Sequence, residues 1–176
     1  IKVQKFILSI DQGTTSTRSI IFNKKFEIVS HDQLEFKQFY PKDGFVEHDP
    51  DEIFNSVLQT SNNVIKKAKI HSRQISSIGI TNQRETVVIW DRITGNSIYK
   101  AIVWQDRRTV NYCEDLKRKG FAKKIQKITG LVIDAYFSAT KIKWILENVK
   151  SSKKLLKEDR LLFLSLIHIS EPTRRS

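Results

Sequence analysis

The sequence has a single cysteine and no long apolar segment, and each absence excludes a class of protein. Cys113 alone rules out an intrachain disulfide and a cysteine-based zinc site, a pattern typical of a reducing compartment. We expect Cys113 to be a small buried hydrophobic side chain. No apolar run approaches membrane-spanning length and the first residues do not resemble a secretory signal, so we expect no membrane insertion. The chain begins at Ile1 rather than Met, so we expect its amino end to be incomplete.

Acidic residues are scarce relative to basic ones. The 176 residues include 31 Lys and Arg against 19 Asp and Glu, which gives a formal net charge of +12. A nucleic-acid partner, whose binding would weaken steeply with salt, must therefore be considered. Most of the excess falls within 117–127 and 150–160. Because neither stretch interleaves aromatic residues or matches a basic DNA-reading motif, we expect solvated helix faces and no nucleic-acid partner.

Hydrophobic periodicity predicts an α/β domain. Apolar or alternating runs predict strands at 6–10, 19–22, 26–36, 75–80, 86–90 and 101–104. Asp49 and Pro50 mark a helix start, with Asp49 as the cap and Glu52 at capping-box spacing. The apolar face of this helix is predicted to hold Ile53, Val57, Leu58, Val64, Ile65 and Ala68. Further helices are predicted at 109–119, before Gly130, and at 138–149. His48 has no second ligand at metal-binding spacing, so we expect a surface or loop residue.

The polar loop between the first two predicted strands has the composition of a phosphate site. Gly13 lets a ligand approach the backbone, and residues 14–17 are four consecutive hydroxyl residues. Arg18 is a permanent cation with a planar fork, and Asp11 could hold a hydrated Mg²⁺ that arrives with a nucleotide. No Gly-Lys-Ser/Thr follows, so this is not a Walker loop. An ordinary hairpin turn with solvated hydroxyls explains the loop equally well when it is taken alone.

A second polar site interrupts the apolar stretches at 75–80 and 86–90. Arg84 and Glu85 there could either neutralise each other as a salt bridge or face a polar ligand. A vicinal diol suits such a pair because each hydroxyl both donates and accepts. Trp104 and Tyr136 could add an apolar wall and one hydroxyl. Spacing alone favours the salt bridge.

Five segments in order carry a family resemblance. They are Asp11 to Arg18, Gly44 to Pro50, Gly79 to Thr86, Ala101 to Arg108, and Thr129 to Asp134. Together they resemble the glycerol kinases, which are carbohydrate kinases of the group that shares the actin and sugar-kinase ATPase fold. Residues 81–86 are closer to glycerol kinases than to xylulose or gluconate kinases. The resemblance covers about residues 5–163 and implies a ribonuclease H-like (actin-like ATPase) domain, with a mixed sheet flanked by helices.

The resemblance implies ATP-dependent phosphorylation of glycerol to sn-glycerol 3-phosphate in a cytoplasmic, homo-oligomeric enzyme of glycerol catabolism that uses Mg²⁺. Thr14, Thr15 and Ser16 would contact the phosphates of ATP or ADP. Arg18 would stabilise the transferring group, and Asp11 would position Mg²⁺ through water.

The same resemblance assigns glycerol to the second polar site. Arg84, Glu85 and Tyr136 would hydrogen-bond the substrate, and Trp104 would form part of the apolar wall. Ala135 and Ala139 stand where the family usually has Pro and Gly, which puts the backbone near Tyr136 in question.

Family members are far longer than this chain. We therefore expect 1–163 to be the amino-terminal part of the first kinase domain and 164–176 to be a non-family tail of adapter origin. The second, carboxy-terminal domain would be absent, and with it the catalytic base. The fragment alone is then expected to be inactive and poorly soluble.

Two related alternatives stay open. The chain could belong to a kinase for another polyol or ketose, or to a non-enzymatic actin-like ATP-binding protein. The Arg84–Glu85 pair argues against both, and the stretch around Trp104 argues against the second.

Overall fold

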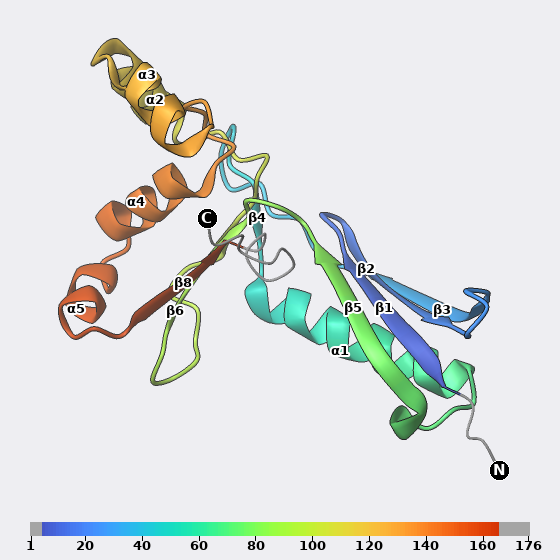
Figure 1. Ribbon diagram of the computed structural model, residues 1–176. Coiled ribbons are helices and arrows are strands. Elements are labelled where there is room, and N and C mark those ends of the chain that lie inside the picture. Colours follow the sequence, from blue (N-terminus) through green and yellow to red (C-terminus); the bar gives the residue numbers. More distant parts are fainter. Residues whose placement is uncertain (1–4, 166–176) are drawn as a thin grey trace. The chain divides into compact units, whose positions relative to one another are not determined.

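The computed structural model describes residues 5–165, which fold into two compact units (Figure 1). The first unit holds the chain up to residue 37 together with 49–83. The second holds 38–48 and the chain from residue 84 onward. Within the described range, no helix is long and apolar enough to cross a membrane.

The first unit contains a four-stranded mixed sheet in the order β3-β2-β1-β5. Its strands are β1 (Phe6–Gln12), β2 (Ser16–Phe22), β3 (Ile28–Glu35) and β5 (Ile75–Asn82). β1 pairs antiparallel with β2 and parallel with β5, which confirms the predicted mixed sheet. The strand expected at 75–80 runs on through Thr81 and Asn82, because both residues continue the parallel ladder with β1.

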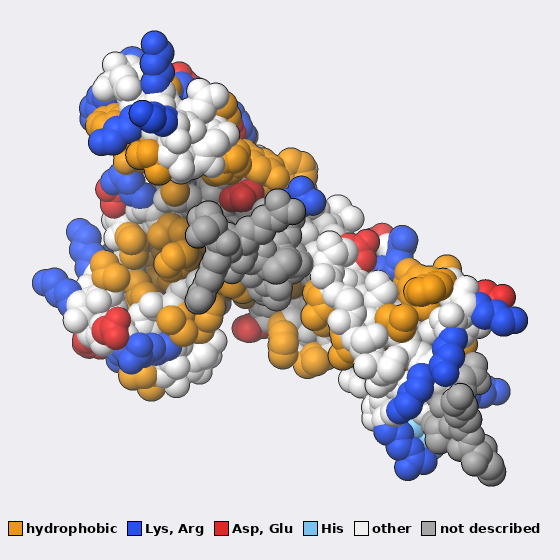
Figure 2. Space-filling view, viewed as in Figure 1, with side chains coloured by type: hydrophobic (Ala, Val, Ile, Leu, Met, Phe, Trp, Pro, Cys, Tyr) orange, Lys and Arg blue, Asp and Glu red, His pale blue; other side chains and the backbone are white. Residues whose placement is uncertain are grey.

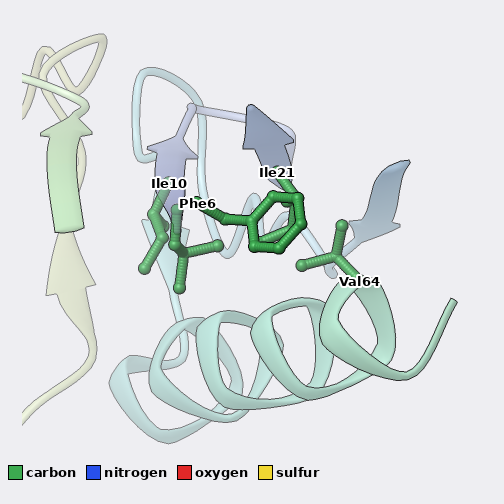
Figure 3. Close-up of a cluster of buried hydrophobic side chains, with 5 residues drawn as sticks. Phe6, Ile10, Ile21 and Val64 are labelled. Atoms are coloured by element: carbon green, nitrogen blue, oxygen red, sulfur yellow. The ribbon is translucent and has the colours of Figure 1, made fainter. Parts of the chain in front are cut away.

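The core of the first unit lies between this sheet and the helix α1 (Pro50–Lys67). Successive strand residues point to opposite faces, so Phe6, Leu8 and Ile10 all reach the same side of β1. They pack with Ile21 of β2 and Val64 of α1, and all five side chains are almost fully buried. Figure 3 shows Phe6, Ile10, Ile21 and Val64 converging in this space.

The start of α1 follows the predicted capping signal. The Asp49 carboxylate accepts hydrogen bonds from the backbone N–H groups of Asp51 and Glu52, at 3.0 and 3.4 Å. Pro50 occupies the first helical turn, where its missing N–H costs nothing. The Glu52 carboxylate accepts from the backbone N–H of Lys37 and so ties the end of the β3 segment to the helix.

The buried face of α1 differs from the prediction at one position. Ile53 and Val64 are buried as expected, but Leu58 is 46% exposed, so its placement on this face was wrong. Leu58 lies five residues after Ile53, which places it about 140° around the helix axis. Ser56 and Thr60 instead lie on the buried stripe.

These two buried hydroxyl residues are satisfied by the sheet. Ser56 Oγ lies 2.7 Å from Thr17 Oγ1, and Thr60 Oγ1 lies 2.8 Å from Ser19 Oγ. Both β2 partners are fully buried, so the helix and the strand satisfy each other's polar groups without water.

The second unit contains an antiparallel sheet in the order β4-β7-β6-β8. Its strands are β4 (Glu47–His48), β7 (Ala101–Ile102), β6 (Val87–Asp91) and β8 (Leu161–Ser165). The strand predicted at 101–104 ends at Ile102, because Val103 turns the chain by accepting the Asp106 N–H. Leu164 and Ser165 pair with β6, whereas the rest of the tail expected at 164–176 lies outside the described residues.

Four helices belong to the described part of the second unit. They are α2 (Val110–Arg118), α3 (Phe121–Thr129), α4 (Ser138–Asn148) and α5 (Ser152–Lys157). The first three match the predicted helices closely. Cys113 is buried against Ile133 and Ala135, as expected for a small hydrophobic side chain. The lysines of both basic stretches are exposed, and Figure 2 shows Lys and Arg side chains projecting over α2 and α3.

His48 is fully buried in β4, so its prediction as a surface or loop residue was wrong. Its Nε2 lies 2.5 Å from Gln38 Oε1, and burial lowers the pKa of the imidazole to about 4. A neutral imidazole with a hydrogen-bond partner can be buried at low cost. The prediction used only the absence of a second metal ligand near His48, and that absence carries no information about burial.

Candidate functional site

The predicted phosphate loop is a tight turn between β1 and β2. The N–H of Gly13 donates to the carbonyl oxygen of Ser16 at 2.9 Å. A Cβ at Gly13 would lie 3.2 Å from that same oxygen, so glycine lets the turn close this tightly. The antiparallel register places Asp11 opposite Arg18 across the two strands. The structure therefore brings together Asp11, Thr14, Thr15, Ser16 and Arg18 at one hairpin end.

Arg18 is oriented by a residue that the sequence analysis missed. Its Nε and Nη2 both donate to Gln33 Oε1, at 2.9 and 2.7 Å. The Gln33 amide nitrogen donates in turn to Ser16 Oγ at 3.0 Å. Gln33 is the cross-strand neighbour of Arg18 in β3, so the hairpin register was the signal that could have identified it. One side chain thus connects the cation of the loop to one of its hydroxyls.

Buried amides support the base of the loop. Gln12 Nε2 donates to the Gly13 carbonyl at 2.7 Å, and the Gln83 N–H donates to the Gln12 carbonyl at 2.8 Å. Asn82 Nδ2 donates to the Gln83 carbonyl at 2.9 Å. In the described part of the chain, Asn82 Oδ1 is a buried side-chain atom with no hydrogen bond. This network holds the ends of β1 and β5 together beneath Gly13.

In the second unit, the Glu85 carboxylate is held by the start of α4. Its Oε2 accepts from the backbone N–H of Ser138 at 3.0 Å and from Ser138 Oγ at 2.6 Å. These two bonds fix the Glu85 carboxylate on the first residue of α4. Arg84 is exposed beside it.

A fully buried lysine lies behind Glu85. Lys141 Nζ donates to the carbonyl oxygen of Tyr136, and it lies 3.4 Å from those of Glu85 and Phe137. Burial lowers the pKa of Lys141 to about 8, against the raising effect of nearby carboxylates that include Glu85. Sequence analysis missed this residue, although it lies on the same helical stripe as Ile145.

Aromatic rings extend this cluster. The ring centroids of Trp104 and Tyr136 are 5.9 Å apart, and those of Tyr136 and Phe137 are 5.2 Å apart. The Tyr136 N–H donates to Asp134 Oδ1 at 2.8 Å. Ala135 is buried in the core, so this departure from the family pattern is accommodated. The structure therefore brings Trp104 and Tyr136 together, next to the segment that holds Glu85.

Within residues 5–165, no group of three or more His, Cys, Asp or Glu side chains is arranged to hold a metal ion. Asp11 is an exposed oxygen ligand beside hydroxyls, which suits a hydrated Mg²⁺ that is carried mainly by another ligand.

Comparisons with known proteins identify the family of the chain. Residues 6–168 match the model for the N-terminal domain of the FGGY family of carbohydrate kinases. The chain is 56% identical over 161 residues to a glycerol kinase of Clostridium botulinum strain Hall, covering 92% of this chain and 32% of that protein. A glycerol kinase of Thermoanaerobacter sp. strain X514 is also 56% identical, over 159 residues, 90% of this chain and 32% of its own length.

Solved structures give the same result. The crystal structure of Plasmodium falciparum glycerol kinase with ADP matches with a TM-score of 0.85 and 38% identity, over 93% of this chain and 33% of that one. A gluconate kinase from Lactobacillus acidophilus matches with a TM-score of 0.79 at 22% identity, over 93% and 32% of the two chains, which shows the shared fold. The expected actin-like ATPase fold is thus confirmed, and the chain spans about a third of the length of the curated relatives it matches. The chain belongs to the FGGY family of carbohydrate kinases, within the N-terminal domain of that family.

Proposed function

We propose that the whole protein transfers the γ-phosphoryl group of ATP to glycerol, giving sn-glycerol 3-phosphate and ADP. The observation that carries this proposal is the difference in identity among solved structures. The glycerol kinase structure is 38% identical to this chain, whereas gluconate and xylulose kinase structures from Lactobacillus acidophilus are 22% and 24% identical. The identity of 56% to bacterial glycerol kinases supports the same substrate. The other kinases of the family remain the alternative.

The polyol would bind at the second polar site. Glu85 supplies an anionic acceptor, Arg84 a cationic donor and Tyr136 a phenolic hydroxyl, which together suit the adjacent hydroxyls of a triol. Trp104 packs against Tyr136 and offers the apolar surface that the carbon chain of a polyol needs.

The nucleotide phosphates would bind at the β1–β2 turn. Thr14, Thr15 and Ser16 offer hydroxyl and backbone N–H donors, and Arg18 would offset the charge that spreads over the transferring phosphoryl oxygens. Asp11 fits a water-mediated contact to the Mg²⁺ that accompanies ATP, and bound Mg²⁺ would supply charge neutralisation of the phosphates. The ADP named for the Plasmodium structure agrees with this ligand class.

The residues of this chain would position both substrates rather than remove the proton. The oxygen of a primary hydroxyl attacks the γ-phosphorus, the bond to the β-phosphate oxygen breaks, and the hydroxyl proton must pass to a base. We place that base in the part of the relatives that this chain does not cover. We also propose a cytoplasmic homo-oligomer without a nucleic-acid partner. The exposure of the lysines in both basic stretches supports the reading of those lysines as solvated surface.

The test is a coupled ATP-consumption assay on a hybrid enzyme. In this hybrid, residues 6–163 of the chain replace the matching segment of the Clostridium botulinum glycerol kinase. We expect turnover with glycerol well above that with xylulose or gluconate, and no turnover from the 176-residue chain alone. Arg84→Gln should lower kcat/KM for glycerol about 10- to 100-fold, the effect of one charged hydrogen bond. A folded hybrid that prefers a ketose or a sugar acid would refute the assignment of glycerol.

A further inference from the structure

Glu85 has a backbone conformation that needs outside support. Its φ is +56°, in the left-handed region that residues other than glycine rarely adopt. Such a conformation persists only where surrounding contacts determine it, and it is often found at ligand sites. The contacts around Glu85 therefore decide where its carboxylate points.

Two residues of α4, one helical turn apart, supply those contacts from opposite ends of Glu85. Ser138 holds the side chain, because its N–H and Oγ both bond Oε2. Lys141 holds the main chain, because its ammonium faces the Glu85 carbonyl at 3.4 Å. Both bonds from Ser138 fall on Oε2, so Oε1 is the carboxylate oxygen that we assign to a ligand.

The same ammonium also holds the segment that carries the aromatic wall. Lys141 Nζ donates to the Tyr136 carbonyl and lies 3.4 Å from the Phe137 carbonyl. The lysine side chain has no exposed surface, so water cannot replace these acceptors without opening the core. Three backbone carbonyls from two separate segments thus converge on one buried cation.

A lysine used only for packing would not need this arrangement. Buried lysines are rare unless their donors are satisfied, and an apolar side chain would fill the space at lower cost. The neighbouring Lys143 shows the ordinary alternative, since it is 38% exposed and pairs with Glu147 one turn along the helix. A charge on the buried face of α4 is explained if it orients the segments that bind the substrate.

We propose that Lys141 is a positioning residue, whose buried ammonium holds the Glu85 turn and the 136–137 segment together so that Glu85 Oε1 and the Tyr136 side chain are presented to one ligand. The identity of that ligand as a polyol rests on the function proposed above, whereas the positioning itself does not.

The first measurement is independent of activity. Because the Ser138 N–H bonds the Glu85 carboxylate, its amide proton resonance reports the position of that carboxylate in a ¹H–¹⁵N spectrum of the 176-residue chain. We expect Lys141→Met to shift this resonance upfield, and Lys143→Met, the matched control on the same helix, to leave it unchanged. A folded Lys141→Met variant with an unchanged Ser138 resonance would overturn the proposal.

A pH titration of the unmutated chain decides the case if Lys141→Met does not fold. Loss of the ammonium proton, with a pKa of about 8, weakens the bonds to the three carbonyls, so the Ser138 resonance should move with a midpoint near that value. The charged or titratable groups that act on Lys141 are Glu85, Asp106, Asp134 and Cys113. Burial raises the pKa of the Cys113 thiol above its ordinary value, which moves the titration of that thiol away from the range of Lys141. A Ser138 resonance that stays constant through this range would contradict the proposed role.

The second measurement uses the hybrid enzyme. Misplacing a substrate-positioning group by about 1 Å can lower kcat/KM on the order of a hundredfold, so Lys141→Met should reduce kcat/KM for glycerol to that extent. KM for ATP should stay within twofold, and Lys143→Met should match the parent hybrid. Equal losses of kcat/KM for glycerol and for ATP would indicate general damage to the enzyme and would overturn the positioning role. If the parent hybrid does not use glycerol, the function proposal fails while the amide measurement still decides the role of Lys141.

Discussion

Replacing Arg108 by Met should destabilise the second unit severely. The Arg108 side chain is fully buried, and its Nη2 donates to Glu47 Oε1 at 2.7 Å and to Asp106 Oδ2 at 2.8 Å. Its guanidinium carbon lies 4.0 Å from the ring centroid of Phe45 and 4.4 Å from that of Trp144. Burial alone would lower the pKa of Arg108, but its hydrogen bonds to Asp106 and Glu47 raise it above the ordinary value.

The size of the effect follows from the two carboxylates that the variant would leave behind. Glu47 and Asp106 are 5% and 1% exposed, so neither can be solvated after the cation is removed. Breaking a buried ion pair by removing one partner costs about 3–5 kcal/mol. Domains of this size are stable by about 5–15 kcal/mol, so the loss is a large share of the total. Because Met keeps much of the packing volume of Arg, the measured loss of stability reports mainly the missing charge rather than missing packing contacts.

Tryptophan fluorescence during urea unfolding measures this effect selectively. The three tryptophans, Trp90, Trp104 and Trp144, all lie in the second unit, so the signal reports that unit alone. Arg107→Met is the matched control, because Arg107 is 52% exposed and its pair with Asp134 should contribute less than about 1 kcal/mol. If Arg108→Met and Arg107→Met shift the urea midpoint equally, the buried cation does not stabilise this unit as argued.

Four further changes test other parts of the structure. Asp49→Ala removes the cap of α1 and should cost about 1 kcal/mol in a thermal melt followed by circular dichroism. Thr17→Val leaves the Ser56 hydroxyl with one partner fewer and should cost about 1–2 kcal/mol, and adding Ser56→Ala should recover part of this loss. His48 has a pKa of about 4 in the fold and about 6.5 when unfolded, so the native state binds fewer protons between these values. The contribution of neutral His48 to the free energy of unfolding is complete above pH 6.5 and is lost as pH falls toward 4. The urea midpoint of His48→Gln should therefore depend less on pH across that window than the midpoint of the unmutated chain. In the hybrid enzyme, Gln33→Leu should raise KM for ATP several-fold while the thermal midpoint stays close to that of the parent, and an unchanged KM would contradict its support of Arg18.

The sequence predicted the first unit well because its signals are local. The alternation in β1, the hairpin after it, and the Asp49 cap each depend on a few neighbouring residues. Strand β4 was missed and strand β7 was predicted two residues too long, because so short a segment has no measurable period. The burial of His48 was missed for the same reason, since its place in β4 depends on pairing with Ala101, far along the chain.

The candidate site shows the same difference between local and long-range signals. The residues that would touch ligands were predicted because their chemistry is carried by their own side chains, and their roles stay predictions until variants are measured. The residues that hold them were missed. Gln33 acts across a strand pair, and the acceptors of Lys141 are backbone carbonyls that any residue type could provide.

The sequence does, however, contain a sign of Lys141 that periodicity could have used. Residues 138, 141 and 145 lie on one face of a helix, and Ile145 is fully buried. A lysine on such a stripe must either extend its ammonium to solvent or find acceptors in the core. Because Ser138 and Tyr136 lie within five residues of it, the start of its own helix was the nearest place to look for them. A charged residue on a predicted apolar stripe is therefore a useful marker for residues that support a site, even where the partners themselves have no sequence signature.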